Sequence, residues 1–207
     1  MIASDIQGCY EAIRKGSQSF YAASKLLPKQ VRDPAVVLYA FCRVADDTVD
    51  AKNAPQDAID FLRERLELAY RGTPKDEPID RAFAALVEMS KMPRELPDAL
   101  LEGLEWDSLN LRFETLSDLH SYSARVASAV GVMMCVLMNV RDKDVLARAC
   151  DLGAAMQLTN IARDIGEDAR NGRLYVPLVW MSEEGLNPNK FLRSPQPSKK
   201  IARIAKR

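Results

Sequence analysis

Apolar residues recur three and four positions apart through most of the chain, and helix-start signals interrupt this pattern at frequent intervals. Asp33 and Pro34 are a capping residue followed by proline at the first helical position, and they predict a helix that runs to about Asp50. Asp142 to Asp144 begin a second long helix that should end before Gly172. We find no strand-like alternation and no internal repeat. These patterns predict an all-α fold of about eight helices joined by short loops.

The size and the charge of the chain favour one domain without a nucleic-acid partner. A chain of 207 residues buries roughly 70% of its unfolded surface, which is enough for one well-formed core. Its 29 Lys and Arg residues balance 29 Asp and Glu residues, so the net charge indicates neither nucleic acid nor an acidic partner. From Lys190 to Arg207, however, every charged residue is basic. This stretch predicts either a helix face with a loop or a peripheral contact with an anionic membrane surface.

Other features limit the compartment and the chemistry. The four cysteines include no CxxC pair and imply no disulfide framework. The N-terminus lacks the basic and apolar regions of a signal peptide. The most apolar run, Val126 to Val140, is shorter than the roughly 20 residues needed to cross a bilayer. We therefore expect a cytoplasmic protein. The single histidine, His120, argues against a zinc site built on imidazoles and leaves carboxylates, hydroxyls and a metal ion to carry any chemistry.

The helix after Pro34 carries an acidic stripe. Tyr39, Arg43, Asp46 and Asp50 are spaced four, three and four positions apart, so they share one face of the helix. Asp46 and Asp50 are then stacked one turn apart, where like charges destabilise a bare helix. A divalent cation would offset that cost. The DDxxD pattern from Asp46 to Asp50 is short, and on its own a solvated polar face explains it equally well.

The second long helix repeats this arrangement over a greater length. One of its faces changes from apolar to amide and then to carboxylate through Leu146, Cys150, Gly153, Gln157, Asn160, Asp164 and Asp168. A cavity lined in this way would be apolar at depth and acidic at its mouth, which suits a substrate with a hydrocarbon tail and a diphosphate head. Mg²⁺ prefers oxygen ligands and is commonly held by one or two carboxylates together with phosphate oxygens. The two stripes together therefore favour a metal–diphosphate site over two solvated faces.

Both stripes lie in segments that resemble the squalene/phytoene synthase family. Residues 42–50 are similar to the first aspartate-rich helix of this family, and residues 157–177, from Gln157 to Pro177, are similar to the second. The segments 16–20, 26–28 and 122–131 also fit, and the resemblance extends from about residue 6 to about residue 187. It is strongest to the bacterial, carotenoid-pathway branch that makes phytoene. The resemblance implies a single-domain helical bundle of the class I isoprenoid synthase type with a central cavity.

The resemblance also implies roles for individual residues. The metal ligands would be Asp46, Asp50, Asn160, Asp164 and Asp168, holding Mg²⁺, or Mn²⁺ as a substitute, against the diphosphates. The substrate-binding residues would be Ser17, Ser19, Phe20, Arg43, Val126, Gln157, Asn160 and Arg163. Tyr122 matches the tyrosine that the family places near the reacting cation, where its ring face would stabilise the cation or its hydroxyl relay a proton. The alternative for Tyr122 is a packing aromatic between helices. The catalytic residues are thus expected to be Asp46, Asp50, Tyr122, Asp164 and Asp168.

The implied reaction is a Mg²⁺-dependent, head-to-head condensation of two geranylgeranyl diphosphates to phytoene, with release of diphosphate and without NADPH. One alternative is a C15-specific enzyme that makes squalene or dehydrosqualene, because pocket length decides between the two substrates. Another is a non-catalytic member or fragment of the family that acts as an assembly or binding protein. Retention of all four aspartates argues against this second alternative. The sequence does not indicate an oligomeric state.

Members of this family extend well past the equivalent of Arg207. We therefore expect residues 1–207 to be one C-terminally truncated domain, in which residues from about 188 to 207 form a loop and the start of an incomplete helix.

Overall fold

The computed structural model describes residues 2–50 and 57–207, apart from the side chain of Asp50. These residues form helices and contain no strand, which confirms the all-α prediction. The helices are α1 (Ala3–Gly16), α2 (Gln18–Ser24), α3 (Lys29–Asp50), α4 (Ala58–Tyr70), α5 (Pro78–Ser90), α6 (Glu95–Ser108), α7 (Leu116–Ser123), the π-helical turn η1 (Ala124–Ser128), α8 (Ala129–Leu137), α9 (Lys143–Arg170), α10 (Leu178–Glu183), α11 (Pro188–Arg193) and α12 (Lys199–Ile204).

The described helices outnumber the eight expected because helices expected to be continuous are divided and because the short helices α10 and α11 were not predicted. The helical backbone is interrupted at Ser17, which is extended and separates α1 from α2. Most of the apolar run of residues 126–140 belongs to a continuous rod in which α7 passes through η1 into α8, and the last three residues of the run follow the end of α8 at Leu137. This rod begins at Thr115, whose side chain forms a reciprocal capping box with Asp118. Hydrophobic spacing therefore predicts longer helices than the structure contains, because this spacing continues across a single extended residue or a π-turn.

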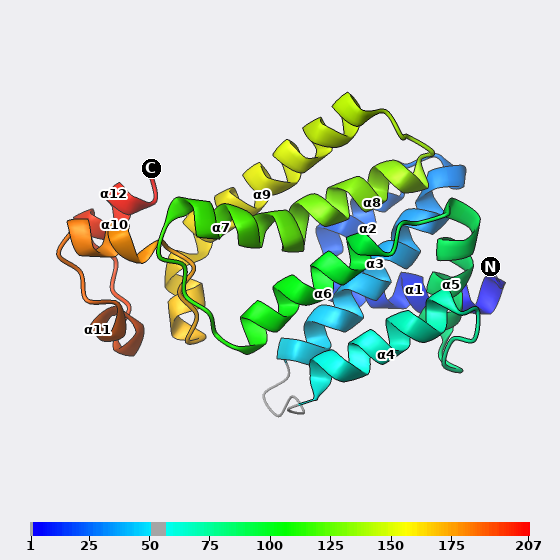
Figure 1. Ribbon diagram of the computed structural model, residues 1–207, viewed down its shortest axis with the longest axis horizontal. Coiled ribbons are helices and arrows are strands. Elements are labelled where there is room, and N and C mark those ends of the chain that lie inside the picture. Colours follow the sequence, from blue (N-terminus) through cyan, green and yellow to red (C-terminus); the bar gives the residue numbers. More distant parts are fainter. Residues whose placement is uncertain (1, 51–56) are drawn as a thin grey trace.

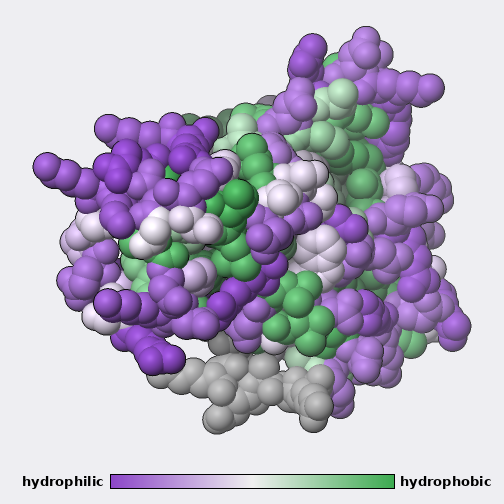
Figure 2. Space-filling view, turned by 60° about the vertical axis from the view of Figure 1, so that its left-hand side comes forward, coloured by the Kyte–Doolittle hydropathy of each residue, from purple (hydrophilic) through white to green (hydrophobic). Residues whose placement is uncertain are grey.

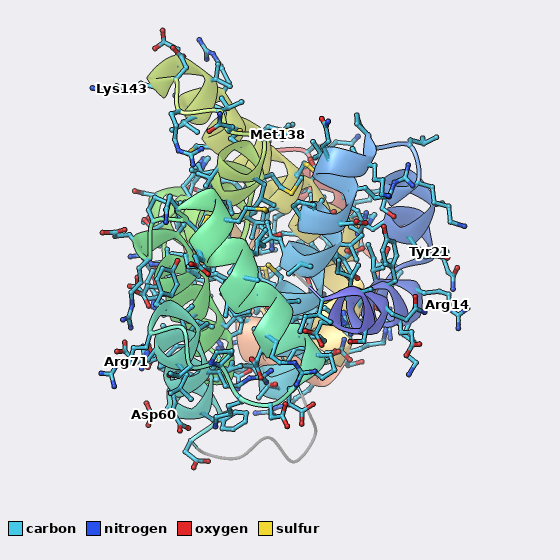
Figure 3. The ribbon with its side chains drawn as sticks, turned by 90° about the vertical axis from the view of Figure 1, so that its right-hand side faces the viewer. Arg14, Tyr21, Asp60, Arg71, Met138 and Lys143 are labelled. Carbon is cyan, nitrogen blue, oxygen red and sulfur yellow. The ribbon has the colours of Figure 1, made fainter. Side chains whose placement is uncertain are left out.

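The helices pack around α3 and α9. Helices α1 and α5 pack against α3, α6 lies between α3 and the α7–η1–α8 rod, and that rod runs along α9 (Figure 1). The main core contains side chains from α1, α3, α4, α5, α6 and α8, with Phe41 and Phe83 stacked at 3.8 Å between ring centroids. The first residues of α9, with Lys143, project from the end of the bundle (Figure 3). The far end of α9 leads into α10–α12, which lie at the opposite end of the molecule from the N-terminus (Figure 1).

Helix α3 begins one turn earlier than predicted. It starts at Lys29, so Pro34 lies inside the helix and Asp33 does not cap it. Asp33 instead accepts a hydrogen bond of 2.8 Å from the hydroxyl of Tyr10 on α1. The capping prediction was wrong because the helix already begins at Lys29, so the residues that follow Asp33 do not form its first turn. The prediction for α9 is confirmed, since Asp142 caps the helix and α9 ends at Arg170.

The C-terminal helices form a small cluster of their own. Met181, Phe191 and Ile204 are buried there against the end of α9. Two of the basic residues in this region are paired, Arg203 with Glu184 and Arg207 with Glu183. On the face that includes this end of the molecule, apolar surface is interrupted by hydrophilic side chains (Figure 2). No helix in the described part of the chain is both long enough and apolar enough to cross a bilayer.

Candidate active site

Seven of the predicted site residues line one cavity of about 400 Å³ in the middle of the bundle. They are Ser17, Phe20, Arg43, Asp46, Tyr122, Val126 and Gln157. The wall combines charged side chains at the end of α3 with apolar side chains from α6 and α8, among them Leu100, Leu104 and Val130. A second groove of about 270 Å³, between α7, α9, α10 and α12, contains none of the predicted residues. The central cavity is therefore the candidate active site.

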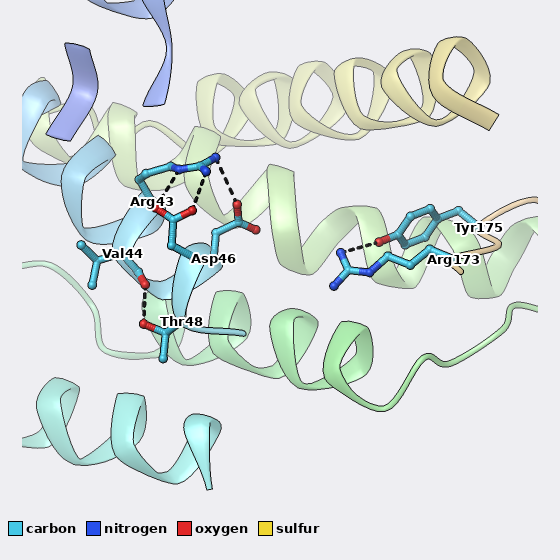
Figure 4. A network of polar contacts seen from close by, with 7 residues as sticks. Arg43, Val44, Asp46, Thr48, Arg173 and Tyr175 are labelled. Carbon is cyan, nitrogen blue, oxygen red and sulfur yellow. Dashed lines mark hydrogen bonds and ion pairs between the residues drawn. The ribbon is translucent and has the colours of Figure 1, made fainter. Parts of the chain in front are cut away.

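Helix α3 ends in charged side chains that pair with one another. Arg43 donates to both carboxylate oxygens of Asp47, at 3.1 and 2.5 Å, and lies 3.5 Å from Asp46 (Figure 4). Burial lowers the pKa of the Arg43 guanidinium, but the hydrogen bond to Asp47 and the charges of both aspartates outweigh burial and raise this pKa. Asp50 also belongs to the predicted site, but its side chain lies outside the described residues. The acidic stripe of α3 thus presents Arg43 and Asp46 to the cavity as an ion pair.

The break between α1 and α2 brings hydroxyls and an aromatic ring to the cavity. The Ser17 hydroxyl accepts a hydrogen bond of 3.2 Å from the backbone N–H of Phe20 and lies 3.1 Å from the hydroxyl of Ser19. The ring of Phe20 is 54% exposed and lies 5.8 Å from the ring of Tyr39, between centroids. A Cβ atom at Gly16 would lie 2.7 Å from the Tyr39 hydroxyl and 3.1 Å from a side-chain carbon of Arg43, so a side chain at position 16 would displace these two cavity residues. Ser19 supports Ser17 from outside the cavity wall.

Tyr122 is anchored by a buried carboxylate that sequence analysis missed. Its hydroxyl donates to Asp107 at 2.8 Å, and the hydroxyl of Tyr175 donates to the other oxygen of Asp107 at 2.7 Å. Arg173 donates to the Tyr175 hydroxyl at 3.3 Å (Figure 4). Burial, followed by the charge of Asp107, raises the pKa of Tyr122 far above its ordinary value, so this hydroxyl stays protonated. Tyr122 is 3% exposed and its ring stacks on Tyr175 at 5.2 Å.

The acidic end of α9 continues the face of Gln157 beyond the cavity wall. Arg163 donates to Asp164 through two nitrogens, at 2.7 and 2.6 Å, and this hydrogen bonding lowers the pKa of Asp164. The pKa of Asp168 is raised to about 6, first by burial and then by the charges of Asp164 and Glu167. Arg173 opposes this shift, whereas Asp107 adds to it. Negative charge therefore accumulates at this end of α9, next to the Tyr122 network.

The two acidic stripes do not form a ready-made metal cage. Within residues 2–49 and 57–207, no three His, Cys, Asp or Glu side chains converge on a point that could hold an ion. Asn160, half-buried, lies on the α9 face between Gln157 and Asp164. The structure thus brings Asp46 to the cavity and places Asn160, Asp164 and Asp168 along the adjoining stretch of α9. An arrangement of this kind suits an ion that takes many of its ligands from phosphate oxygens.

The sequence predicted neither the polar network around Tyr122 nor the place of Tyr39 in the cavity wall. Asp107, Arg173 and Tyr175 form the network around Tyr122, and Tyr39 lines the cavity. Tyr39 had a usable signal, because it lies four residues before Arg43 on the acidic stripe. Arg173 and Tyr175 belong to the segment similar to the second family motif. Asp107 had no local signal, since its partners are 15 and 68 residues away in the chain.

The arrangement of helices around this cavity matches known isoprenoid synthases. A crystal structure of a dehydrosqualene synthase in complex with a ligand superimposes with a TM-score of 0.87 and 33% sequence identity, covering 98% of this chain and 71% of that chain. The fold is therefore the class I isoprenoid synthase fold. The family model described as squalene/phytoene synthase matches residues 13–207, and the chain belongs to this family. Enzymes of the family are prenyl transferases that generally depend on a divalent metal.

Two similar proteins are bacterial phytoene synthases. The phytoene synthase of Rhodobacter capsulatus is 61% identical over 211 residues, which cover 100% of this chain and 62% of that protein. The phytoene synthase of Cereibacter sphaeroides is 58% identical over 218 residues, covering 100% of this chain and 61% of that protein. The chain thus spans about three fifths of the length of these relatives.

Proposed function

We propose that the chain provides the catalytic cavity of a head-to-head prenyl transferase that condenses two geranylgeranyl diphosphates to phytoene. The observation that carries this proposal is the lining of the central cavity, which joins Arg43 and Asp46 to an apolar wall that includes Leu104 and Val126. A diphosphate head suits the charged residues, and an isoprenoid tail suits the apolar wall. The identity of 61% to a protein named phytoene synthase supports the C20 substrate.

The donor set fits a hard divalent cation such as Mg²⁺, with Mn²⁺ as a substitute. Carboxylate and amide oxygens are what Mg²⁺ prefers. Burial and then the charges of Asp164 and Glu167 raise the pKa of Asp168, so a nearby cation would stabilise its ionised form. Asp46, Asp50, Asn160, Asp164 and Asp168 are the residues that would hold the ion. When bound, the ion supplies positive charge that stabilises the departing diphosphate.

The arginines of both stripes bind diphosphate by exchanging partners. Arg43 is paired with Asp47, and Arg163 is paired with Asp164. In the loaded site both guanidiniums turn from these carboxylates to diphosphate oxygens, for which Arg is suited by its planar fork of donors. The Ser17 hydroxyl donates to the same group, and Ser19 positions Ser17 through the contact of 3.1 Å between the two hydroxyls. Each arginine thus keeps a counter-charge until the substrate arrives.

Tyr122 and the apolar wall guide the carbon skeleton. Loss of the first diphosphate leaves an allylic cation, which alkylates the second substrate and releases a proton to give a cyclopropyl diphosphate. Loss of the second diphosphate and rearrangement give a cation that releases a second proton to form phytoene, so no hydride donor is consumed. Tyr122 lines the cavity, and its hydroxyl hydrogen is directed at Asp107, so this hydrogen bond fixes the ring beside the reacting carbons. Phe20 and Val126 shape the tail pocket, and Gln157 orients the head.

Product analysis tests the proposal. The purified chain is incubated with radiolabelled geranylgeranyl diphosphate and Mg²⁺ without NADPH, beside an Asp164→Ala variant and a sample containing EDTA. We expect phytoene from the wild type with Mg²⁺, and none from the Asp164→Ala variant or from the sample containing EDTA. Product from farnesyl diphosphate and none from the C20 substrate would establish the C15 alternative. No hydrocarbon from either substrate, with the protein folded by circular dichroism, would contradict catalysis by this chain.

A further inference from the structure

The π-helical turn η1 lies between two glycines on neighbouring helices. On one side, a Cβ atom at Gly153 of α9 would lie 2.7 Å from the carbonyl oxygen of Ala127 and 2.7 Å from the Cα atom of Ser128. On the other side, a Cβ atom at Gly103 of α6 would lie 2.5 Å from a methyl carbon of Val126. Contacts below about 3 Å are not tolerated between such atoms. The missing side chains of both glycines therefore create the space that η1 occupies.

Polar contacts hold the backbone of η1 in this space. The Ser128 hydroxyl donates to the carbonyl oxygen of Cys150 on α9 at 2.7 Å. Arg125 forms an ion pair of 3.0 Å with Glu102 on α6, and its guanidinium lies 4.3 Å from the ring centroid of Trp106 on the same helix. Because η1 is fastened to α6 and to α9, its backbone cannot move away from either one without breaking these contacts.

A side chain at position 103 would consequently displace the side chain of Val126. Valine has one strongly preferred rotamer in helical backbone, so its methyl groups have few alternative positions. Val126 also belongs to the wall of the central cavity, beside Leu104 and Val130. With α6 behind it and the η1 backbone held in place, the open direction for Val126 is the cavity.

We propose that Gly103, which does not itself line the cavity, determines the length of isoprenoid tail that the site accepts. Its missing side chain leaves space for Val126 to pack against α6, away from the cavity. This inference rests on the proposed function and names the specificity determinant of the same site. Any side chain at position 103 would push Val126 forward and shorten the space for the tail. A C20 tail would then lose affinity, whereas a C15 tail, which needs less depth, would retain it.

Binding measurements with four proteins test this role. The thiodiphosphate analogues of the C20 and C15 substrates, which do not ionise readily, are titrated calorimetrically in Mg²⁺ into the wild type, Gly103→Ala, Val126→Ala and the double variant. One methyl group in an apolar pocket changes affinity by about 10-fold or more. We expect Gly103→Ala to weaken C20 binding about 10-fold and C15 binding less than about 3-fold. The double variant should recover C20 affinity, because truncation of Val126 removes the atom that collides.

A fifth protein separates tail specificity from folding. Val126→Leu enlarges the same wall and leaves every residue of α6 unchanged, so it should reproduce the selective loss of C20 binding even if Gly103→Ala fails to fold. Equal losses for both tail lengths in Gly103→Ala, or no recovery in the folded double variant, would overturn the inference while leaving the proposed function intact. Failure of the folded wild type to bind either analogue would instead overturn the proposed function, and this inference with it.

Discussion

Replacing Asp107 by asparagine should lower the thermal midpoint of the protein by about 4–12 °C. The carboxylate of Asp107 accepts hydrogen bonds from Tyr122 and Tyr175 on different oxygens. An amide keeps one acceptor oxygen but places an NH₂ group opposite the second hydroxyl. Loss of a hydrogen bond to a charged group costs about 1.5–3 kcal/mol, and a 207-residue protein loses about 2–4 °C of midpoint for each kcal/mol. A total cost of about 2–3 kcal/mol gives the stated range.

The assay is thermal unfolding followed by circular dichroism, combined with a double-mutant cycle. Tyr175→Phe removes one donor to Asp107 and keeps the ring. If the network acts as a unit, the double variant should cost less than the sum of the single variants. Additive effects, or an unchanged midpoint for Asp107→Asn, would refute the network as described.

Asp80→Asn is the matched control for a buried carboxylate. Asp80 is 5% exposed and forms an ion pair of 2.9 Å with Arg65, away from the central cavity. Removing one partner of a buried pair also destabilises the fold. We therefore expect both variants to lower the midpoint, but only Asp107→Asn to impair conversion of substrate at a temperature where both remain folded.

Asp168→Asn should raise the midpoint of the metal-free protein at pH 8 and raise it less at pH 5. The folded-state pKa of Asp168, about 6, is above the ordinary value, so the ionised carboxylate destabilises the fold above pH 6. Protonation of Asp168 relieves this cost as the pH falls. An equal gain in midpoint at both pH values would contradict the raised pKa. Gly153→Ala should cost about 3 kcal/mol in chemical denaturation by overpacking η1, whereas Gly166→Ala, whose new methyl would have only the flexible end of one arginine within 4 Å, should be neutral or gain up to about 1 kcal/mol. Arg43→Gln should change the unfolding free energy by less than about 1 kcal/mol, because the ion pair of Arg43 with Asp47 is exposed. The same variant should weaken diphosphate binding more than about 10-fold in calorimetry. Unchanged binding would show that Arg43 does not bind the diphosphate.

The parts of the site that the sequence could predict are those encoded by local spacing. Arg43 and Asp46, and likewise Gln157 and Asp164, lie on continuous helices, so their order on one face follows from helical geometry alone. The pairing of Arg43 with the neighbouring Asp47 was also accessible, since residues four apart on a helix are neighbours.

The remaining features depend on tertiary packing. Tyr122 meets Asp107 only because α6 and α7 pack together, and no local pattern marks an aspartate at the end of α6 as buried. The residue types of the π-turn that sets the position of Val126 likewise do not predict this turn. The roles of Gly103 and Gly153 depend on the close approach of η1, which is a feature of tertiary packing. Asp33, which was predicted to cap α3, likewise accepts a hydrogen bond across helices from Tyr10.

The most direct test of the central claim asks whether the stripes of α3 and α9 act on one substrate. Calorimetry in Mg²⁺ compares binding of the C20 thiodiphosphate to the wild type, Asp46→Asn, Asp164→Asn and the control Asp151→Asn, which changes an exposed aspartate nearer the start of α9. We predict that Asp46→Asn and Asp164→Asn each weaken Mg²⁺-dependent binding more than about 10-fold, and that Asp151→Asn leaves it unchanged. Loss of binding in only one of the two stripe variants, with both folded, would contradict a shared metal–diphosphate site.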